Sequence, residues 1–578
     1  MSERTLNWQR SLPRILFIVF ILWFIFTLIL NPIFSVIVDS FTQSGTLDFT
    51  SVSKILQSDR ALKAIRNSFI LAVTLTITCN IVGIFIVFAT EYFDLKGSRL
   101  LSLGYMTVLI FGGLILNNGY LLVYGEDGIV TRFLTSIFTG LDPNWFEGFP
   151  AVLFVMTFAC TNLHMLFLRN AVRGLDYNII EAGQNLGSSQ GEVLKKIVLP
   201  SLKPVLLTMV IMTFQTGLGA MAAPLMVGGR EFNTISPLIL TFSQRPGSRD
   251  LAAVLAILLG LFQIILLVII TVNERRGNYL SVSKTKIVLK KQKINHPVMN
   301  ILVHLIAYLL FIIYTLPFVM VIIMSFMKSE AIKSGVISFA NFTLENYQKI
   351  LVDAGAYQPF LTSTLFSAFS AIGSVLLMTL VVHFLFKNQH NRFIQWLEYP
   401  FFIPWLLPSL LIGLGFILAY SKPSWLLFGE STIGSLWTLP VAYLIVLLPS
   451  TLRYIKSAYY SFDQNLEEAS LILGASSFRT FFKVLIPCLL PTLLALIAIN
   501  FNGKLADYDL SAFLYQPNSP TLGIVIRQNA DPQANLDAKA INFVYSVILM
   551  GINAIVMYLV YGKGNDWLIR AAGRRRGK

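Results

Sequence analysis

The segment NFNGKLADYDL at residues 500–510 holds residue types that could bind a charged solute. Its polar members are Asn502, Lys504, Asp507 and Asp509, and Lys504 and Asp507 stand three residues apart, so they would pair on one face of a helix. Ionisable groups in or near a membrane span are costly and usually functional. We expect these four side chains, with Gln215, to line a solute path or its outer gate. The alternative is that the charges mark the outer end of a short helix and face water.

No other set of residues indicates catalysis or metal binding. Cys79, Cys160 and Cys488 lie in or next to apolar runs without CxxC spacing, so they indicate neither a metal site nor a disulfide framework. The sequence has no GxxxxGK[ST] phosphate-binding loop, so the chain itself is not expected to hydrolyse ATP. We therefore expect no catalytic residue, no metal site and no bound cofactor, and a membrane-embedded enzyme is disfavoured.

The composition is that of an integral membrane protein. Of 578 residues, 55% are hydrophobic and 13% are charged, whereas a soluble domain is typically about 25% charged. The net charge of +15 could indicate nucleic-acid binding, but basic cytoplasmic loops explain it in a membrane protein, and no nucleic-acid partner is expected. The first apolar run, to about residue 38, is long enough to span a bilayer and indicates an uncleaved transmembrane helix.

Apolar runs of spanning length predict an all-α membrane protein with about 12 transmembrane helices in two six-helix halves. The predicted domains are a first half at 1–273, a linker at 274–298, a second half at 299–562 and a tail at 563–578. The predicted spans are about 15–38, 68–90, 100–123, 150–170, 201–226 and 251–273, then 299–325, 362–386, 399–420, 434–453, 488–505 and 540–561.

Lysine and arginine residues predict the orientation of these spans. They cluster before the first span, in the linker and in the tail, and such clusters favour the cytoplasmic side. Each half must then cross the membrane an even number of times, which six helices satisfy. We expect both termini in the cytoplasm, with the linker's basic run a determinant of topology or, alternatively, also a site for anionic lipid. The residues are Arg4, Arg10, Arg14, Arg275, Arg276, Lys284, Lys286, Lys290, Lys291, Lys293, Arg570, Arg574, Arg575, Arg576 and Lys578.

One polar stretch occurs twice in this apolar chain. EAGQNLGSSQGEVLKKIVLP at 181–200 recurs as EASLILGASSFRTFFKVLIP at 468–487, and the copies align without a gap at an offset of 287 residues. The chain therefore looks like a tandem duplication, and since both copies must lie on one side of the membrane, the repeat is parallel rather than inverted. The matched pairs include Glu181 and Glu468, Ala182 and Ala469, Gly187 and Gly474, and Pro200 and Pro487.

Each copy contains the residues of a helix, a corner and a second helix. Asp176 and its repeat partner Asp463 can cap a short helix, and Gly187 and its repeat partner can adopt the positive φ that ends it. An amphipathic helix follows, and Pro200 and its repeat partner then begin the next transmembrane helix, where a missing N–H costs nothing. Such a rigid projection is suited to docking in a partner's groove, whereas an ordinary capped loop would not explain the duplication.

The pattern E-A-[AGS]-x-x-L-G, with L/I-P about twelve residues later, resembles the signature loop of binding-protein-dependent ABC importer permeases. The resemblance covers both halves, and two halves fused in one chain resemble the ferric-iron-type branch. Gly183 and Ser470 stand where the family usually has a second Ala, and both are small enough for close helix packing. The stretch GGLILNNGY replaces an expected Pro-rich pattern, so the two halves are expected to differ.

The resemblance implies the type I ABC importer permease fold, with coupling loops at about 171–200 and 458–487. It implies that the matched Glu, Ala, Gly and Pro residues form coupling helices, each seated in a cleft of a cytoplasmic ATPase subunit. Two copies of that subunit would hold the ATP and Mg, and an extracytoplasmic binding protein would deliver substrate. The chain would then be a permease of the bacterial cytoplasmic membrane that imports by alternating access.

The substrate implied by the fused architecture is ferric iron or an iron compound. The alternatives within the same transporter class are a polyamine, thiamine, a phosphonate or another small anion. A secondary transporter is the alternative from a different class. It would need coupling-ion sites near the midplane, and few acids lie within the predicted spans outside residues 504–509.

Overall fold

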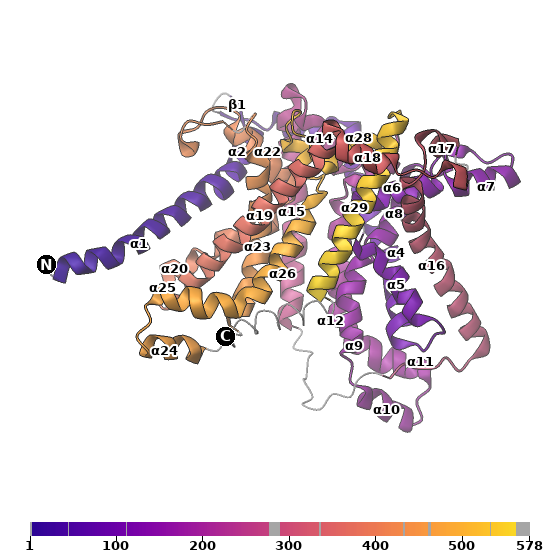
Figure 1. The fold of residues 1–578 in the computed structure, drawn as a ribbon, viewed down its shortest axis with the longest axis horizontal. Helices are drawn as coiled ribbons and strands as arrows, with labels where there is room; N and C mark the ends of the chain where they lie inside the picture. Colours follow the sequence, from indigo (N-terminus) through magenta and orange to yellow (C-terminus); the bar gives the residue numbers. More distant parts are fainter. Residues whose placement is uncertain are drawn as a thin grey trace.

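The computed structural model shows a bundle of long helices (Figure 1) and describes residues 3–43, 46–110, 113–276, 290–334, 337–431, 434–460, 464–531 and 533–561. Ten of its helices are long and apolar enough to cross a membrane, or up to 12 if each of two bent pairs is one span. The prediction of an all-α membrane protein is confirmed, and the predicted number of spans is reached when the bent pairs are counted.

The helices of the two halves follow a similar order, and some of them match in length. The first half contains α1 (Glu3–Phe24), α2 (Asn31–Phe41), α3 (Thr50–Gln57), α4 (Asp59–Val87), α5 (Ser98–Ile110), α6 (Gly113–Tyr124), α7 (Ile129–Ile137), α8 (Gly148–Ala159), α9 (Arg169–Arg173), α10 (Tyr177–Asn185), α11 (Gln190–Val193), α12 (Leu199–Leu218), α13 (Ala222–Val227), α14 (Ile235–Ser243) and α15 (Arg249–Arg276). The second contains α16 (Pro297–Ser325), α17 (Ser329–Ser334), α18 (Glu345–Val352), α19 (Ala354–Lys387), α20 (Arg392–Trp396), α21 (Ile403–Leu406), α22 (Ser409–Tyr420), α23 (Thr438–Tyr460), α24 (Gln464–Ile472), α25 (Ser477–Thr480), α26 (Ile486–Leu505), α27 (Ser511–Leu514), α28 (Leu522–Asn529) and α29 (Leu536–Tyr561). Two short strands, β1 (Thr42–Gln43) and β2 (Thr46–Leu47), pair in antiparallel fashion.

Two predicted spans, 100–123 and 399–420, are bent rather than straight. Ser98–Leu109 and Gly113–Ile137 meet at 114°, and Arg392–Leu406 and Ser409–Tyr420 meet at 105°. In the second pair Leu407 is extended, with φ −117° and ψ 143°, because Pro408 disfavours the helical conformation of the residue before it.

The tandem repeat is present in the backbone at the same offset as in the sequence. α10 and α24, α11 and α25, and α12 and α26 begin and end at positions 287 residues apart. A π-helical segment stands at the matched place in each copy, at Leu194–Val198 and Phe481–Leu485. The duplicated sequence therefore specifies a duplicated local structure.

The first membrane helix of each half packs against the other half. α2 packs against α22, and the Phe24 and Phe401 rings lie 6.3 Å apart between their centroids. Asn31 Nδ2 donates a hydrogen bond to the Tyr420 hydroxyl at 3.1 Å. Figure 1 shows α1 and α2 on the side of the molecule that carries α19 and α22.

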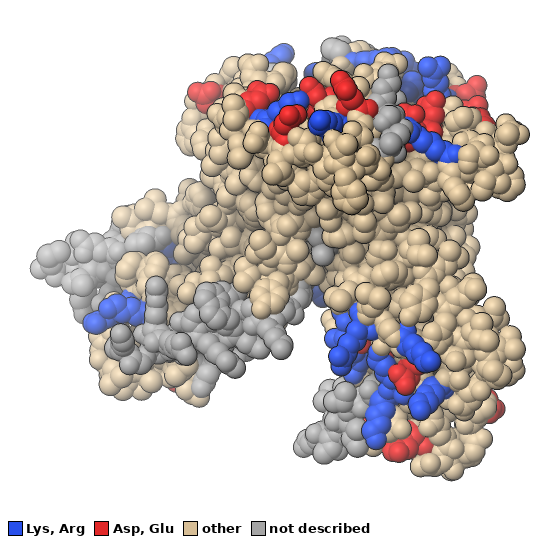
Figure 2. All heavy atoms as spheres, turned by 45° about the vertical axis from the view of Figure 1, so that its right-hand side comes forward, with Lys and Arg blue, Asp and Glu red and all other residues tan. Residues whose placement is uncertain are grey.

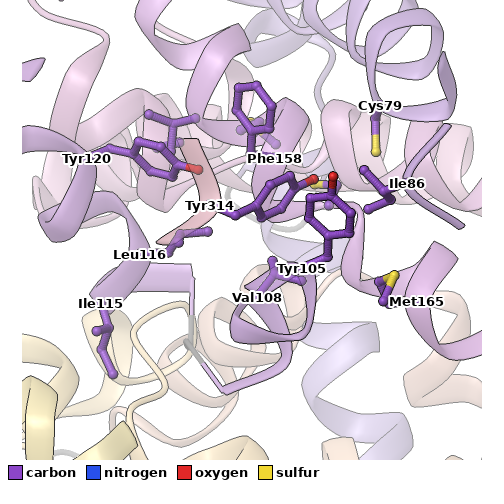
Figure 3. Packing of buried hydrophobic residues seen from close by; sticks show 14 of the residues in the cluster. Cys79, Ile86, Tyr105, Val108, Ile115, Leu116, Tyr120, Phe158, Met165 and Tyr314 are labelled. Atoms are coloured by element: carbon purple, nitrogen blue, oxygen red, sulfur yellow. The ribbon is translucent and has the colours of Figure 1, made fainter. Parts of the chain in front are cut away.

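α16 makes the reciprocal contact with α5 and α6. Its Tyr314 lies between Tyr105 and Phe158 of the first half, with ring centroids 5.3 and 5.4 Å away (Figure 3). The Tyr314 hydroxyl and Thr161 Oγ1 form a hydrogen bond of 2.7 Å, which satisfies a polar atom in an otherwise apolar core. Burial of these large rings joins the two halves into one core.

The two ends of the bundle carry different charges. We call the end with α10, α11, α24 and α25 the loop face, and the end with α14, α28 and the β1–β2 hairpin the opposite face (Figure 1). Figure 2 shows acidic and basic side chains interspersed on the upper, opposite face and mostly basic side chains on the lower right lobe at the loop face. Lysines exposed at the loop face include Lys195, Lys203, Lys291 and Lys293.

Candidate functional site

The duplicated stretches form two projections at the loop face, which we call loop 1 (171–200) and loop 2 (458–487). In loop 1 the Asp176 carboxylate accepts the backbone N–H of Asn178 at 3.1 Å and caps α10, as predicted. The matching cap predicted for Asp463 lies outside the described residues.

Each loop turns at the predicted glycine. Gly187 has φ +86° and Gly474 has φ +82°, so both occupy the left-handed region that a side chain disfavours. The Gly187 N–H bonds to the Gln184 carbonyl at 2.9 Å and the Ser188 N–H to the Gly183 carbonyl at 3.2 Å. Loop 2 repeats both bonds at its own positions, so each short helix ends in a Schellman motif.

The second helix of each loop begins at a capping serine. Ser189 accepts the Glu192 N–H at 3.3 Å while the Glu192 carboxylate accepts the Ser189 N–H at 3.1 Å, which completes a capping box. In loop 2, Ser476 accepts the Arg479 N–H at 3.3 Å. Both corners are therefore fixed by local sequence.

The prediction that Pro200 begins the transmembrane helix needs a correction, which also applies to Pro487. Each proline lies in the first turn of α12 or α26, but the helix already runs unbroken from Gln190 to Leu218 and from Ser477 to Leu505. The π segment before each proline widens the turn, as in the bond from the Leu199 N–H to the Leu194 carbonyl. The missing N–H of the proline is thereby accommodated inside a continuous helix.

The tips of both loops expose apolar side chains. Leu186 is 88% exposed and its repeat partner Leu473 is 86% exposed, while Phe478 in loop 2 is 74% exposed. The signature residues Glu181, Ala182, Glu468 and Ala469 are exposed as well. Apolar side chains gathered on a polar projection are typical of a surface that another protein covers.

The linker holds loop 1 to the bundle. Gln184 Nε2 donates to Gln292 Oε1 at 2.8 Å, and the Lys290 ammonium lies 5.2 Å from the centroid of the Tyr177 ring. The Gln292 N–H bonds in turn to the Tyr92 carbonyl at 2.8 Å. Residues 290–295, which we call the strap, therefore join loop 1 to the end of the α4 span.

Loop 2 is attached through side chains of the second half. Glu467 forms a 2.9 Å ion pair with Lys387 at the end of α19, and the Glu467 side chain is only 15% exposed. The Phe481 ring packs 4.5 Å from the His383 imidazole between centroids. Ser470 Oγ and Thr480 Oγ1 form a 3.0 Å hydrogen bond, so this small residue ties the two helices of loop 2 together.

The polar cluster at 504–509 lies just beyond α26. Lys504 Nζ and Asp507 Oδ1 are 2.9 Å apart, and each side chain is 11% exposed, so this pair is largely buried. The predicted pairing is present, but not on one helical face, because α26 ends at Leu505. Asp507 instead caps the following turn, where its Oδ2 accepts the Leu510 N–H at 3.1 Å, and the Tyr443 ring lies 5.2 Å from Lys504 Nζ.

The other predicted path residues differ in their surroundings. Asp509 has an exposed side chain, yet desolvation by surrounding protein, aided by the Asp507 charge and opposed by Lys504, raises its pKa to about 6. Asn502 Oδ1 is buried and has no hydrogen-bond partner among the described residues. Gln215 is half-buried on α12, in the other half.

A protein-family model described as "Binding-protein-dependent transport system inner membrane component" matches residues 100–277 and 384–571, one match around each loop. The chain belongs to this permease family. A probable ABC transporter permease of Sinorhizobium fredii is 34% identical over 545 residues, covering 94% of this permease and 95% of the relative.

Other relatives are more distant. A ferric transport system permease of Actinobacillus pleuropneumoniae is 21% identical and covers 95% of this permease and 77% of the relative. A putative 2-aminoethylphosphonate transport permease of Salmonella typhimurium is 23% identical over 44% of this permease and 90% of the relative. A bacterial ABC transporter involved in alginate import is a structural neighbour with TM-score 0.38 and 16% identity, covering 48% of this permease and 100% of that chain.

Two features of the permease were missed by sequence reasoning. The strap brings residues about 100 positions away onto loop 1, as between Gln190 Nε2 and the Lys293 carbonyl. Glu91 pairs with Arg169 at 2.5 Å and Arg173 at 2.8 Å at the base of loop 1. An acid at the end of an apolar span, as Glu91 is, indicates that it has a basic partner, so this ion pair could have been predicted. No local sequence pattern indicates the strap.

Proposed function

We propose that this permease is the transmembrane subunit of an ATP-driven importer that receives substrate from an extracytoplasmic binding protein. The observation that carries the proposal is the pair of matched loops with exposed apolar tips on one face of the bundle. Two copies of a cytoplasmic ATPase subunit, which hold the ATP and Mg, would each seat one loop. The loop face and both termini then lie in the bacterial cytoplasm, as its excess of lysine favours.

The geometry supports a mechanical link from the loops to the membrane interior. The helix from Ser477 to Leu505 has 29 residues. At 1.5 Å per residue it is roughly 44 Å long, so it reaches from loop 2 to the Lys504–Asp507 pair as one rod. A tilt imposed on the loop therefore moves the far end of the same helix. α11 and α12 provide the equivalent rod in the first half, and alternate tilting would open each side in turn.

Ferric iron or an iron compound is the substrate that we propose. The support is that the ferric transport relative aligns with 95% of this permease, whereas the phosphonate relative aligns with only 44%. A polyamine, thiamine, a phosphonate or another small anion is the alternative in the same class. Uptake of radioactive ferric iron should fall when the gene is deleted and return on complementation; unchanged uptake would contradict this substrate.

The docking role is tested at the loop tips with Leu186→Glu, Leu473→Glu in one chain. These side chains are almost fully exposed, so the fold should survive while an apolar contact becomes a charged one. Copurified ATPase subunits and uptake should both be lost. Leu351→Glu on α18 at the opposite face, where Leu351 is 80% exposed, is the matched control and should keep both.

Deleting the ATPase subunits separates a secondary transporter from an importer. A secondary transporter would continue to transport in cells whose ATPase subunits are deleted. Retention of ATPase subunits by the double variant would show that the loops are not the docking site.

A further inference from the structure

A pocket of about 670 Å³ opens at the loop-face end of α16, outside the two loops and the polar cluster. The first turns of α16 form one wall, residues 94–96 form the second and the strap forms the third. Lys96 and Lys293 contribute the ammonium groups, and Asp94 is the acid in the lining. The pocket therefore combines two cations and one anion with a largely apolar floor.

The wall that carries Lys96 is fixed to α16. His304 Nε2 accepts the Lys96 backbone N–H at 3.3 Å, and the Tyr308 hydroxyl donates to the Lys96 carbonyl at 2.9 Å. Gly97 has φ +74°, and a Cβ there would lie 2.6 Å from the Tyr308 oxygen, so glycine permits this close contact. The Lys96 side chain thus projects from an ordered backbone.

The wall that carries Lys293 is equally well held. The Asp94 N–H bonds to the Gln292 carbonyl at 2.9 Å, and Lys291 Nζ donates to the Thr90 carbonyl at 2.6 Å. Lys96 and Lys293 are both exposed, and neither ammonium group forms an ion pair or hydrogen bond among the described residues. Two positioned cations are therefore available to an anion.

The depth of the pocket indicates the kind of anion. The α16 span begins at Pro297 and the preceding span on the other wall ends at Tyr92, so the pocket lies where helices leave the apolar layer. Exposed apolar side chains continue from it along one face of α16: Ile301 (65%), Leu305 (61%), Leu309 (54%) and Ile312 (54%). A free phosphate needs no such stripe, whereas acyl chains do.

We propose that this pocket binds the headgroup of an anionic phospholipid, with Lys96 and Lys293 on the phosphate and the acyl chains along α16. Basic pockets between membrane helices suit such headgroups. Since the Lys293 carbonyl also accepts a hydrogen bond from Gln190, a bound lipid steadies the strap against loop 1. The site does not depend on which substrate the permease carries.

The test compares lipid binding by the full-length, delipidated permease in detergent, measured by native mass spectrometry. Wild type should bind phosphatidylglycerol more tightly than phosphatidylcholine. Lys96→Gln, Lys293→Gln should weaken phosphatidylglycerol binding by roughly tenfold or more and leave phosphatidylcholine binding unchanged. Lys203→Gln, Lys483→Gln is the matched control, because it removes the same charge from exposed positions of the same face outside the pocket.

A second variant tests the acyl-chain stripe separately. Ile301→Asn, Leu305→Asn should weaken binding of both lipids, because both use acyl chains. Unchanged phosphatidylglycerol binding in the lysine variant would overturn the proposal, and so would an equal loss in the control. Displacement of the lipid by millimolar inorganic phosphate would show a phosphate site instead of a lipid site, which also overturns it.

Discussion

Loop 1 and loop 2 share matched helices and corners over the described residues, but they are attached to the bundle in different ways. Their helices, π segments and positive-φ glycines recur at one offset, and so do the turn bonds and the serine cap of the second helix. Loop 1 is held by the strap, whereas loop 2 is held by an ion pair to α19. The shape that a partner would meet is thus specified locally, and the connection of each loop to its half is specified by long-range contacts.

The segments at the far ends of α12 and α26 differ more strongly. Gly217 packs so closely on α4 that a Cβ there would lie 2.7 Å from the Ala72 Cα. Its repeat partner is Lys504, which is largely buried with Asp507. One half therefore uses this position for tight helix packing, and the other uses it to hold charge.

The largest expected effect comes from making the second half resemble the first at this position. Asp507→Ala leaves the Lys504 ammonium buried and unpaired, which should destabilise the protein by about 3 kcal/mol. Adding Lys504→Gly, the residue of the first half, should recover much of that loss. Thermal unfolding in detergent measures both, and equal stability of the single and double variants would contradict a buried pair.

Two further measurements sharpen this prediction. Lys196→Ala breaks an exposed pair with Glu192 and should leave the melting temperature almost unchanged. Uptake by the Asp507→Ala and Lys504→Ala variants tests the proposed solute path, and wild-type uptake by both, with normal assembly and ATPase activity, would exclude these residues from it.

The next largest effect is expected at the loop corners, where the two halves should respond alike. Gly187→Val and Gly474→Val should each destabilise its corner by about 1–2 kcal/mol and reduce retention of ATPase subunits. No atom lies within 4 Å of a Cβ built at either glycine, so the effect reports backbone conformation alone. Asn, which tolerates positive φ, is the matched control; equal losses with Asn and Val would mean that φ is not the cause.

Loosening the strap should affect loop 1 and not loop 2, with a smaller effect than the changes at the loop corners. Gln292→Ala with Lys290→Ala removes a hydrogen bond and a cation–π contact, each worth about 1 kcal/mol or less. Hydrogen exchange should become several-fold faster in residues 177–199 and stay unchanged in loop 2. Lys387→Ala should instead speed exchange in loop 2 and leave loop 1 unchanged. Faster exchange in both loops from either variant would contradict the claim that the two loops are attached separately.

The smallest effect is a pH dependence of stability that arises from Asp509. Its repeat partner in the first half is Ala222, which cannot titrate. Because the folded-state pKa of Asp509 is raised from 3.8 to about 6, the folded protein keeps a proton that the unfolded chain has released in this window. Stability contributed by this group should therefore fall as pH rises from about 4 to 6. Asp509→Asn should flatten the dependence of melting temperature on pH, and an unchanged slope would contradict the raised pKa.

Local features were predictable from the sequence and distant ones were not. Asp176 and Gly187 act through neighbouring backbone, so their types and spacing were sufficient. Lys504 and Asp507 were predicted to pair, but the end of α26 between them changed the geometry. The strap and the exchange of α2 and α16 depend on contacts between residues from about 100 to about 390 positions apart, which no short pattern records.

The exchanged first helices impose an order on biosynthesis. Trp23 Nε1 donates to the Leu426 carbonyl 403 residues later in the chain, at 3.2 Å. At roughly 5–20 residues per second, the ribosome takes roughly 20–80 s to supply that partner after Trp23 is made. During most of this interval α1 is inserted without its partners from the second half, since Phe384 and Phe401, which pack against it, are also made late. The last of these contacts can form only after nearly three quarters of the polypeptide has been translated.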